Sequence, residues 1–147
     1  MRRDVLGTLM MVTKLMNADM ERGLGPAGLT MARAQVLWEI GGAPGMTQKM
    51  LADRLGVTPR NVTGLVDALE GLGLVERKAH PQDRRAIQLF LTASGAGQFR
   101  QFQAGQEQFA TLLLGDVSPE RLAGLRTELH AIVGKLSALA EGDQTGR

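Results

Sequence analysis

The sequence of 147 residues contains no cysteine and no tyrosine, and its only aromatic side chains are four phenylalanines and one tryptophan. Without cysteine the chain forms no disulfide, no thiolate metal site and no thiol redox switch, which suits a reducing compartment. An apolar content of 44% with 22% charged residues is ordinary for a soluble globular protein. We therefore expect residues 1–147 to form a single domain without covalent cross-links.

A strong charge of one sign is also missing. The formal net charge is +2, and the pI of about 9.5 overstates the basicity because no cysteine or tyrosine loses a proton between neutrality and the lysine range. Between residues 47 and 92 seven basic residues stand against five acidic ones. Positioned basic groups favour a geometrically defined nucleic-acid site over a nonspecific coat.

Long hydrophobic runs are absent as well. The apolar stretch at residues 5–12 is interrupted by Thr8, is too short to span a bilayer, and is followed by no A-x-A cleavage site. We expect no targeting segment, no membrane partner and a cytoplasmic protein.

Residue sets for catalysis or metal binding are lacking too. The two histidines, His80 and His130, lie 50 residues apart, and no serine stands in a G-x-S-x-G motif. The glycine clusters match neither a P-loop nor a dinucleotide fingerprint. We therefore expect no catalytic residues, no metal and no cofactor, and a protein that is not an enzyme.

What the sequence does contain is a short amphipathic helix that begins after Thr47. Thr47 can cap the helix, Met50, Leu51 and Leu55 fall on one face, and Gly56 stops it.

A second helix follows at once. Thr58 suits the N-cap and Pro59 the first helical position, and Gly73 marks the end. The apolar positions that form its buried stripe are Val62, Leu65, Val66, Leu69 and Leu72. Short or hydrogen-bonding side chains occupy the opposite face, as in a recognition helix.

Two strands joined by a charged turn come next. Residues 74–78 and 86–92 read as strands, with Ile87, Leu89 and Leu91 pointing inward in the second. Two tandem helices followed by a hairpin are the order of a winged helix-turn-helix, here over residues 30–95. The fold class is therefore mainly α with a small β-hairpin wing; the alternative is a solvated surface hairpin.

The residues expected to bind DNA lie on these elements. Asn61 could contact adenine through two hydrogen bonds, Arg60 could reach guanine or a phosphate, and arginines at the wing tip could enter the minor groove. Because Gly64 has no side chain, either a DNA contact is missing at this position or the helix backbone approaches the duplex closely. The full set is Thr47, Thr58, Pro59, Arg60, Asn61, Thr63, Gly64, Asp67, Arg77, Arg84 and Arg85.

Helices with narrow apolar seams are expected at both ends, over residues 1–22 and 96–141. The C-terminal seam steps by three and four residues, and an earlier seam repeats these steps at Phe99, Phe102, Gln106, Phe109 and Leu113. We favour homodimerisation over an intrachain bundle, since two copies read two half-sites. The dimerisation residues are Val5, Leu9, Val12, Leu122, Leu125, Leu129, Ile132 and Leu136.

The chain resembles the MarR family of bacterial transcription regulators. The resemblance is carried by TQKMLADRLGVTPRNVTGLVDALEGLGLVERK and by PQDRRAIQLFLTASG, in which Asp83, Arg85, Leu91, Thr92 and Gly95 match the most specific pattern. It implies a homodimer that binds a pseudo-palindromic operator in double-stranded DNA, usually as a repressor. It also implies that Arg85 is the minor-groove arginine of the wing and that Asp83 orients it.

The resemblance further implies release from DNA by a small aromatic or anionic ligand. The residues that this places near the ligand are Met16, Met20, Arg33 and Trp38. From the residues alone, we favour the alternative that the three apolar ones are core and Arg33 is a surface residue. The alternative function is a winged-helix module that binds protein and has lost DNA binding.

Overall fold

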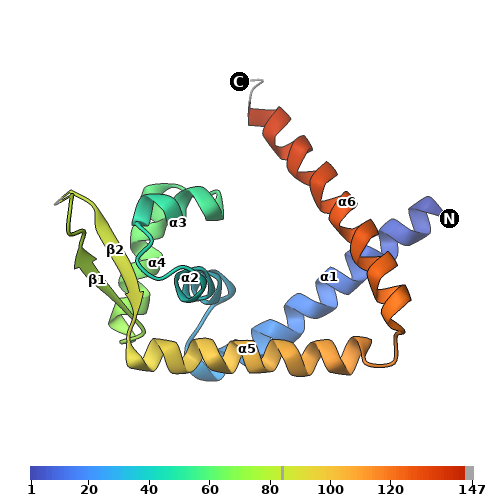
Figure 1. The fold of residues 1–147 in the computed structure, drawn as a ribbon, viewed down its shortest axis with the longest axis horizontal. Helices are drawn as coiled ribbons and strands as arrows, with labels where there is room; N and C mark the ends of the chain where they lie inside the picture. The colour runs from blue at the N-terminus through green and yellow to red at the C-terminus, as the bar shows by residue number, and fades with distance from the viewer. Residues whose placement is uncertain (84, 145–147) are drawn as a thin grey trace. The chain divides into compact units, whose positions relative to one another are not determined.

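The structure is a computed structural model that describes residues 1–83 and 85–144, with residues 140–144 described by their backbone alone. The chain divides into two compact units, Met1–Phe102 and one that begins at Gln103, so the boundary lies within α5. The order of elements is α1 (Arg2–Leu24), a 3-10 turn η1 (Gly25–Ala27), α2 (Met31–Gly42), α3 (Gln48–Leu55), α4 (Pro59–Gly71), β1 (Val75–Ala79), β2 (Ile87–Leu91), α5 (Ala93–Leu114) and α6 (Pro119–Gln144). Figure 1 shows the helices with the one hairpin, which confirms the predicted winged helix-turn-helix.

The helix boundaries around the helix-turn-helix follow from local capping, as expected. The Thr47 hydroxyl accepts a hydrogen bond from the Met50 backbone N–H at 3.2 Å, and the Thr58 hydroxyl accepts one from the Asn61 backbone N–H at 3.2 Å. Gly56 ends α3 with a φ of 63°, in the left-handed region that glycine adopts without strain. These contacts confirm both N-caps and the α3 stop.

The core of the first unit joins α2, α3, α4 and the hairpin. Its fully buried side chains come from one face of each helix and from the inner face of each strand. They are Val36, Leu37, Ile40, Leu51, Val62, Val66, Leu69, Val75 and Leu89. Because Val62, Val66 and Leu69 fix one face of α4 in this core, the opposite face is presented to the solvent in a fixed orientation.

Three side chains predicted to point inward are exposed. Met50 is 48% exposed because it lies on the outer side of α3, where Ala52 rather than Met50 joins Leu51 in the core. Leu72 is 44% exposed because α4 ends at Gly71 and Leu72 is its C-cap. Ile87 is 41% exposed because it lies in the strand pair nearest the turn, opposite Ala79.

A segment outside the hairpin pairs with β2, which the sequence did not predict. β1 and β2 are antiparallel, and the segment before α3 runs along β2: the Gly45 N–H donates to Leu89 O at 2.9 Å and the Leu89 N–H to Met46 O at 2.9 Å. An isolated bridge joins Thr47 to Gln88. The N-terminus of α3 is thereby tied to the wing.

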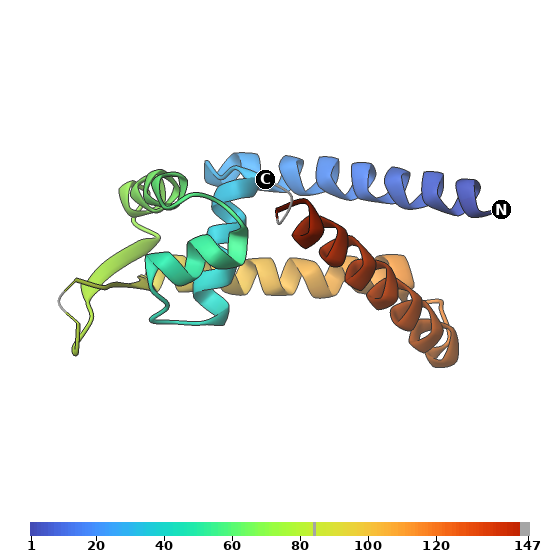
Figure 2. The same ribbon diagram turned by 90° about the horizontal axis from the view of Figure 1, so that it is seen from above.

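α1 is one continuous helix (Figure 2), and much of its surface is apolar and exposed. Among the predicted dimerisation residues on it, Val5 and Val12 are exposed and Leu9 is half-buried. Other exposed apolar side chains on α1 are Leu6, Met10, Met11, Leu15, Met16 and Met20. No helix in the described part of the chain is long and apolar enough to cross a bilayer.

The first part of α5 belongs to the first unit. Phe99 and Phe102 pack against the core, and the Phe99 ring lies 5.2 Å from the Trp38 ring, centroid to centroid. These two positions of the predicted α5 seam are therefore used within the unit that carries the helix-turn-helix.

α6 begins as the sequence predicted. The Ser118 hydroxyl accepts a hydrogen bond from the Arg121 backbone N–H at 3.5 Å, with Pro119 in the first position. The pKa of Glu120 is lowered by its own backbone N–H and by the Ser118 hydroxyl. Along the helix Leu125, Leu129, Val133, Leu136 and Leu139 are exposed, and Leu122 and Ile132 are half-buried.

Candidate nucleic-acid interface

The N-terminal half of α4 presents a polar, exposed face. Arg60, Asn61, Thr63 and Gly64 are exposed, while Val62, between them, is fully buried on the other side of the helix. Thr58 and Pro59, where the helix begins, are exposed too. This face therefore gathers the α4 residues expected to bind DNA, apart from Asp67, at the end of the helix that a recognition helix places against base edges.

Two threonines in the predicted set also make contacts within the protein. Thr47 is half-buried and its hydroxyl caps α3. The Thr63 hydroxyl donates to Pro59 O at 3.0 Å and accepts from the Gln48 side-chain amide at 3.4 Å. Both hydroxyls thus have a structural role whatever they meet outside the chain.

The turn of the wing is closed by short-range hydrogen bonds. The Asp83 carboxylate accepts from the Arg85 backbone N–H at 2.9 Å, and the Ala86 N–H donates to Asp83 O at 3.0 Å. Asp83 therefore acts on the main chain of Arg85, whereas the resemblance implied that it orients the side chain. The Arg85 side chain is exposed, and Arg84 lies outside the described residues.

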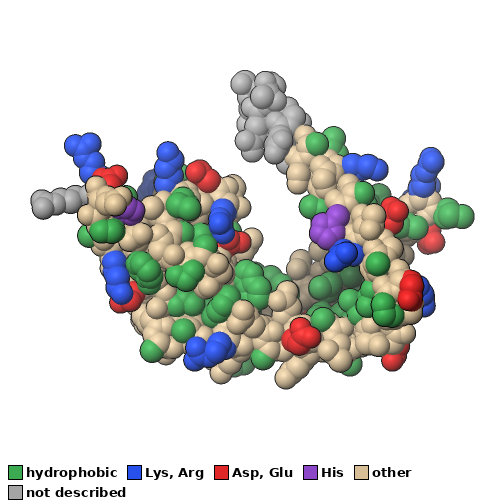
Figure 3. All heavy atoms as spheres, viewed as in Figure 1, with side chains coloured by type: hydrophobic (Ala, Val, Ile, Leu, Met, Phe, Trp, Pro, Cys, Tyr) green, Lys and Arg blue, Asp and Glu red, His purple; other side chains and the backbone are tan. Residues whose placement is uncertain are grey.

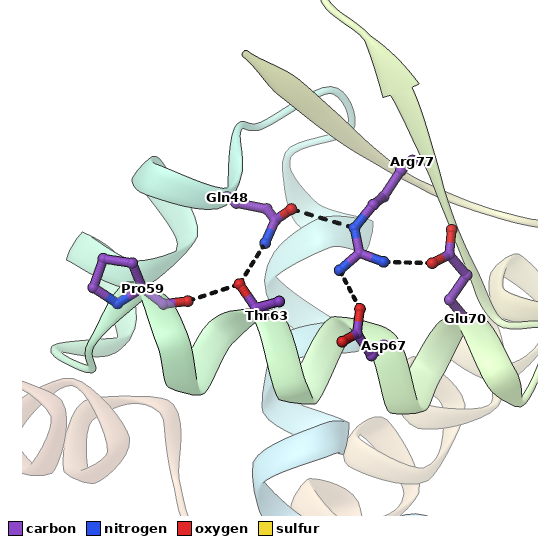
Figure 4. Close-up of polar contacts among 6 residues, drawn as sticks. All are labelled: Gln48, Pro59, Thr63, Asp67, Glu70 and Arg77. Carbon is purple, nitrogen blue, oxygen red and sulfur yellow. Dashed lines mark hydrogen bonds and ion pairs between the residues drawn. The ribbon is translucent and has the colours of Figure 1, made fainter. Parts of the chain in front are cut away.

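Arg77, on β1, is the centre of a polar network (Figure 4). Its Nη2 lies 2.6 Å from a carboxylate oxygen of Asp67, its Nη1 pairs with Glu70, and its Nε donates to the Gln48 side-chain oxygen at 3.2 Å. Only 19% of the Arg77 side chain is exposed. Arg77 and Asp67, both expected to contact DNA, are thus brought together in an ion pair.

Two members of this network, Gln48 and Glu70, were missed by the sequence analysis. Gln48 is the first residue of α3, and Glu70 follows Asp67 by three residues, so both carboxylates lie on one side of α4. The spacing of Asp67 and Glu70 was the one available signal, but it did not identify Arg77 as their partner.

The charge distribution agrees with a positioned site. Figure 3 shows basic and acidic side chains scattered over the visible face, without a broad area of one sign. The cationic groups that remain exposed at the helix-turn-helix include Arg60 on α4 and Arg85 on the wing. A helix face with hydrogen-bonding side chains and a nearby ribbon with an exposed arginine suit the two grooves of double-stranded DNA.

The four residues predicted to bind an effector are used in different ways. The Arg33 guanidinium donates to Gly28 O at 3.3 Å, and Trp38 packs on Phe99. Met16 and Met20 are exposed on α1. Two shallow hollows on α1 are lined by other residues of that helix, among them Thr13, Lys14 and Asn17 in one and Asp4 and Thr8 in the other.

Metal ligands do not cluster in the described part of the chain. No group of three or more histidine, aspartate or glutamate side chains lies together there. His80 Nδ1 accepts from the Gln82 backbone N–H at 3.1 Å within the wing, and His130 Nδ1 lies 2.8 Å from Arg126 O on α6.

Comparison with known families and proteins identifies what the fold resembles. A model of the MarR family matches residues 27–86. The HTH-type transcriptional repressor YetL of Bacillus subtilis (strain 168) is 31% identical over 111 residues, which cover 74% of this chain and 66% of YetL. The repressor MdtR of the same organism is 27% identical over 141 residues, which cover 96% of this chain and 88% of MdtR.

Solved structures share the fold over nearly the whole chain. Streptococcus pneumoniae FabT, solved in complex with DNA, has a TM-score of 0.88 and 23% identity, with coverage of 95% of this chain and 99% of FabT. The S. aureus MepR–DNA complex has a TM-score of 0.74 and 23% identity, with coverage of 88% and 95%.

Proposed function

Because the chain belongs to the MarR family of transcription regulators, we propose that it is a sequence-specific double-stranded DNA-binding protein that represses transcription. The observation that carries this proposal is the exposed N-terminal face of α4, whose opposite side is fully buried. A rigidly held helix with Arg60 and Asn61 at its exposed end can read bases in the major groove, and Arg85 on the wing can reach the minor groove.

A homodimer is part of the proposal. The exposed apolar side chains of α1 and of α6 each need a partner, and a second copy would supply one. A pseudo-palindromic operator with half-sites about 34 Å apart would then meet both recognition helices. Residues 30–95 form the DNA-binding lobe in this proposal. The dimerisation segments are residues 1–22 and the part of 96–141 that follows Phe102.

Regulation by a small ligand also belongs to the proposal. Met16 and Met20, exposed on α1, would form an apolar wall, and Arg33 would pair with an anionic group once it leaves Gly28 O. A ligand releases DNA only if it prefers the dimer state that does not match the operator. Binding rather than catalysis is the proposed activity, and the cytoplasm the proposed location, because a regulator must reach the chromosome.

Selection from a random-sequence duplex library tests the DNA-binding proposal directly. The full chain should enrich a pseudo-palindrome, and the enriched duplex then serves as the probe in fluorescence anisotropy. Arg85→Ala should weaken binding by about tenfold or more, because a charge-assisted contact contributes about 1.5–3 kcal/mol. Asn61→Ala should cost about 1–3 kcal/mol and relax the preference at one base pair.

Arg126→Ala is the matched control, since it removes one exposed arginine from α6 and should change affinity little. Unchanged binding by Arg85→Ala would show that the wing assignment is wrong. Failure to enrich any duplex would refute DNA binding and favour a protein-interaction module.

A further inference from the structure

The structure assigns a role to Arg77 that depends on the proposed DNA binding but differs from a DNA contact. We propose that Arg77 offsets one of the two negative charges of Asp67 and Glu70, which α4 would otherwise present to the phosphate backbone, and that it does not itself touch DNA. Arg77 is then a positioning residue of the interface.

The placement of Arg77 on the hairpin supports this role. Arg77 shares the face of β1 that carries the buried Val75, and its strand partner is the buried Leu89. Its side chain therefore runs along the inner side of the wing, toward α4. With 19% of the side chain exposed, little of the guanidinium is available to a duplex.

The hydrogen bonds of the guanidinium also support this role. All three of its nitrogens have partners within the protein: Nε with Gln48, Nη1 with Glu70 and Nη2 with Asp67. Three of the five guanidinium N–H groups are used in this way, and the two that remain belong to a side chain that is only 19% exposed. Arg85 has no such side-chain contact among the described residues, so it is the better placed of the two for a phosphate or groove contact.

The carboxylates, in contrast, remain accessible. The Asp67 side chain is 59% exposed and that of Glu70 43%. Asp67 follows Thr63 by four residues, so it continues the face of α4 on which Thr63 and Gly64 lie. Without Arg77 two negative charges would border the proposed interface, and with it the three groups sum to a single negative charge. Repulsion from phosphates is thereby reduced where α4 meets the DNA.

A charge cycle on the full chain separates neutralisation from direct contact. The probe is the duplex enriched by the wild-type protein, and affinity is measured by anisotropy over a series of salt concentrations. Arg77→Met should weaken binding by about tenfold, most strongly at low salt, because the two carboxylates are left unpaired. The triple variant Asp67→Asn, Glu70→Gln, Arg77→Met carries no charge at these positions and should return to within about threefold of wild type.

The double variant Asp67→Asn, Glu70→Gln completes the cycle. Its amide oxygens can still accept hydrogen bonds from Arg77, so the fold should be retained, and it should bind at least as tightly as wild type. Arg54→Met is the matched control for charge, because Arg54 pairs with Glu39 of α2 at 3.1 Å and not with α4. Its effect should be clearly smaller than that of Arg77→Met.

Each result decides for or against the inference. A triple variant that is folded by circular dichroism yet binds as weakly as Arg77→Met would mean that Arg77 contacts DNA, and would overturn it. Weaker binding by the double variant would also overturn it, whether or not Arg77→Met folds. Enrichment of a duplex by the wild-type protein does not depend on these variants. A result that contradicts the role of Arg77 therefore leaves the proposed DNA binding intact.

Discussion

Gly64 lies in the second turn of α4, on the exposed face that we propose meets DNA. A Cβ at this position would meet no atom within 4 Å. Neither a contact within the chain nor a left-handed backbone calls for glycine there. A glycine within a helix costs about 1 kcal/mol relative to alanine, so the chain carries this cost without a compensating contact of its own.

Gly64→Ala should therefore raise the free energy of unfolding by about 0.5–1 kcal/mol, measured by denaturant titration. Affinity for the enriched duplex then distinguishes the two roles of Gly64. Weaker binding by the more stable variant indicates that the helix backbone approaches DNA closely. Unchanged binding indicates that position 64 simply makes no side-chain contact with DNA.

Gly71→Ala is the control for this prediction. Gly71 ends the same helix, and a Cβ there also meets nothing within 4 Å. Alanine at 71 should not reduce DNA affinity, because Gly71 lies at the far end of α4 from Asn61. A destabilised Gly64→Ala would show that the space around residue 64 is not open.

At the scale of elements, the join between the hairpin and α5 depends on close backbone contact. The Thr92 hydroxyl donates to Gly73 O at 2.6 Å and accepts from the Gly95 N–H at 3.0 Å. A Cβ built on Gly95 would lie 1.9 Å from the Leu74 carbonyl oxygen. The first turn of α5 can therefore reach the start of β1 only with glycine at this position.

Gly95→Ala should lower the free energy of unfolding by about 1–3 kcal/mol, since the backbone of α5 or of Leu74 must shift. Thermal unfolding followed by circular dichroism measures the loss. Gly97→Ala is the control two residues along α5, where the nearest atom to a Cβ is the flexible end of Arg100 at 3.9 Å. Equal stability of the two variants would contradict the close contact.

For the whole molecule, the feature that matters is the exposed apolar surface of α1 and of α6. Leu125, Leu129 and Leu136 are exposed on α6, as are many apolar side chains on α1. Each of these surfaces is costly to leave in water, and association with a second copy would remove it. Affinity for a pseudo-palindrome should then depend on association, since two lobes bind more tightly than one.

Leu129→Asp should weaken association and operator binding together, because it would bury an unpaired charge in the proposed dimer interface. Sedimentation velocity at micromolar concentration measures the first effect and anisotropy the second. Thr127→Asp is the control, since Thr127 lies off the seam and its hydroxyl bonds only to Ala123 O on the same helix. A wild-type protein that sediments as a monomer would rule out the dimer.

The features that the sequence predicted correctly are those set by neighbours along the chain. Thr47 and Thr58 were assigned as caps because an N-cap acts on a backbone N–H three residues ahead. The buried positions of α4 were predicted from apolar residues that recur every three or four positions. The exposure of Leu72 and Ile87 was not, because a repeat does not reveal where a helix or the core ends.

The tertiary structure alone decided how these elements serve the proposed interface. Gln48, Asp67 and Glu70 are up to 29 residues from Arg77 in sequence, and only the packing of the hairpin against α3 and α4 brings their side chains to one guanidinium. The join between the hairpin and α5 likewise brings Gly95 close to Leu74, 21 residues earlier in the chain. By itself the sequence determined the order of elements, their caps and the family resemblance, because these depend on local spacing. Which charges face outward and which are paired depends on contacts across the fold, and those form only when the core assembles.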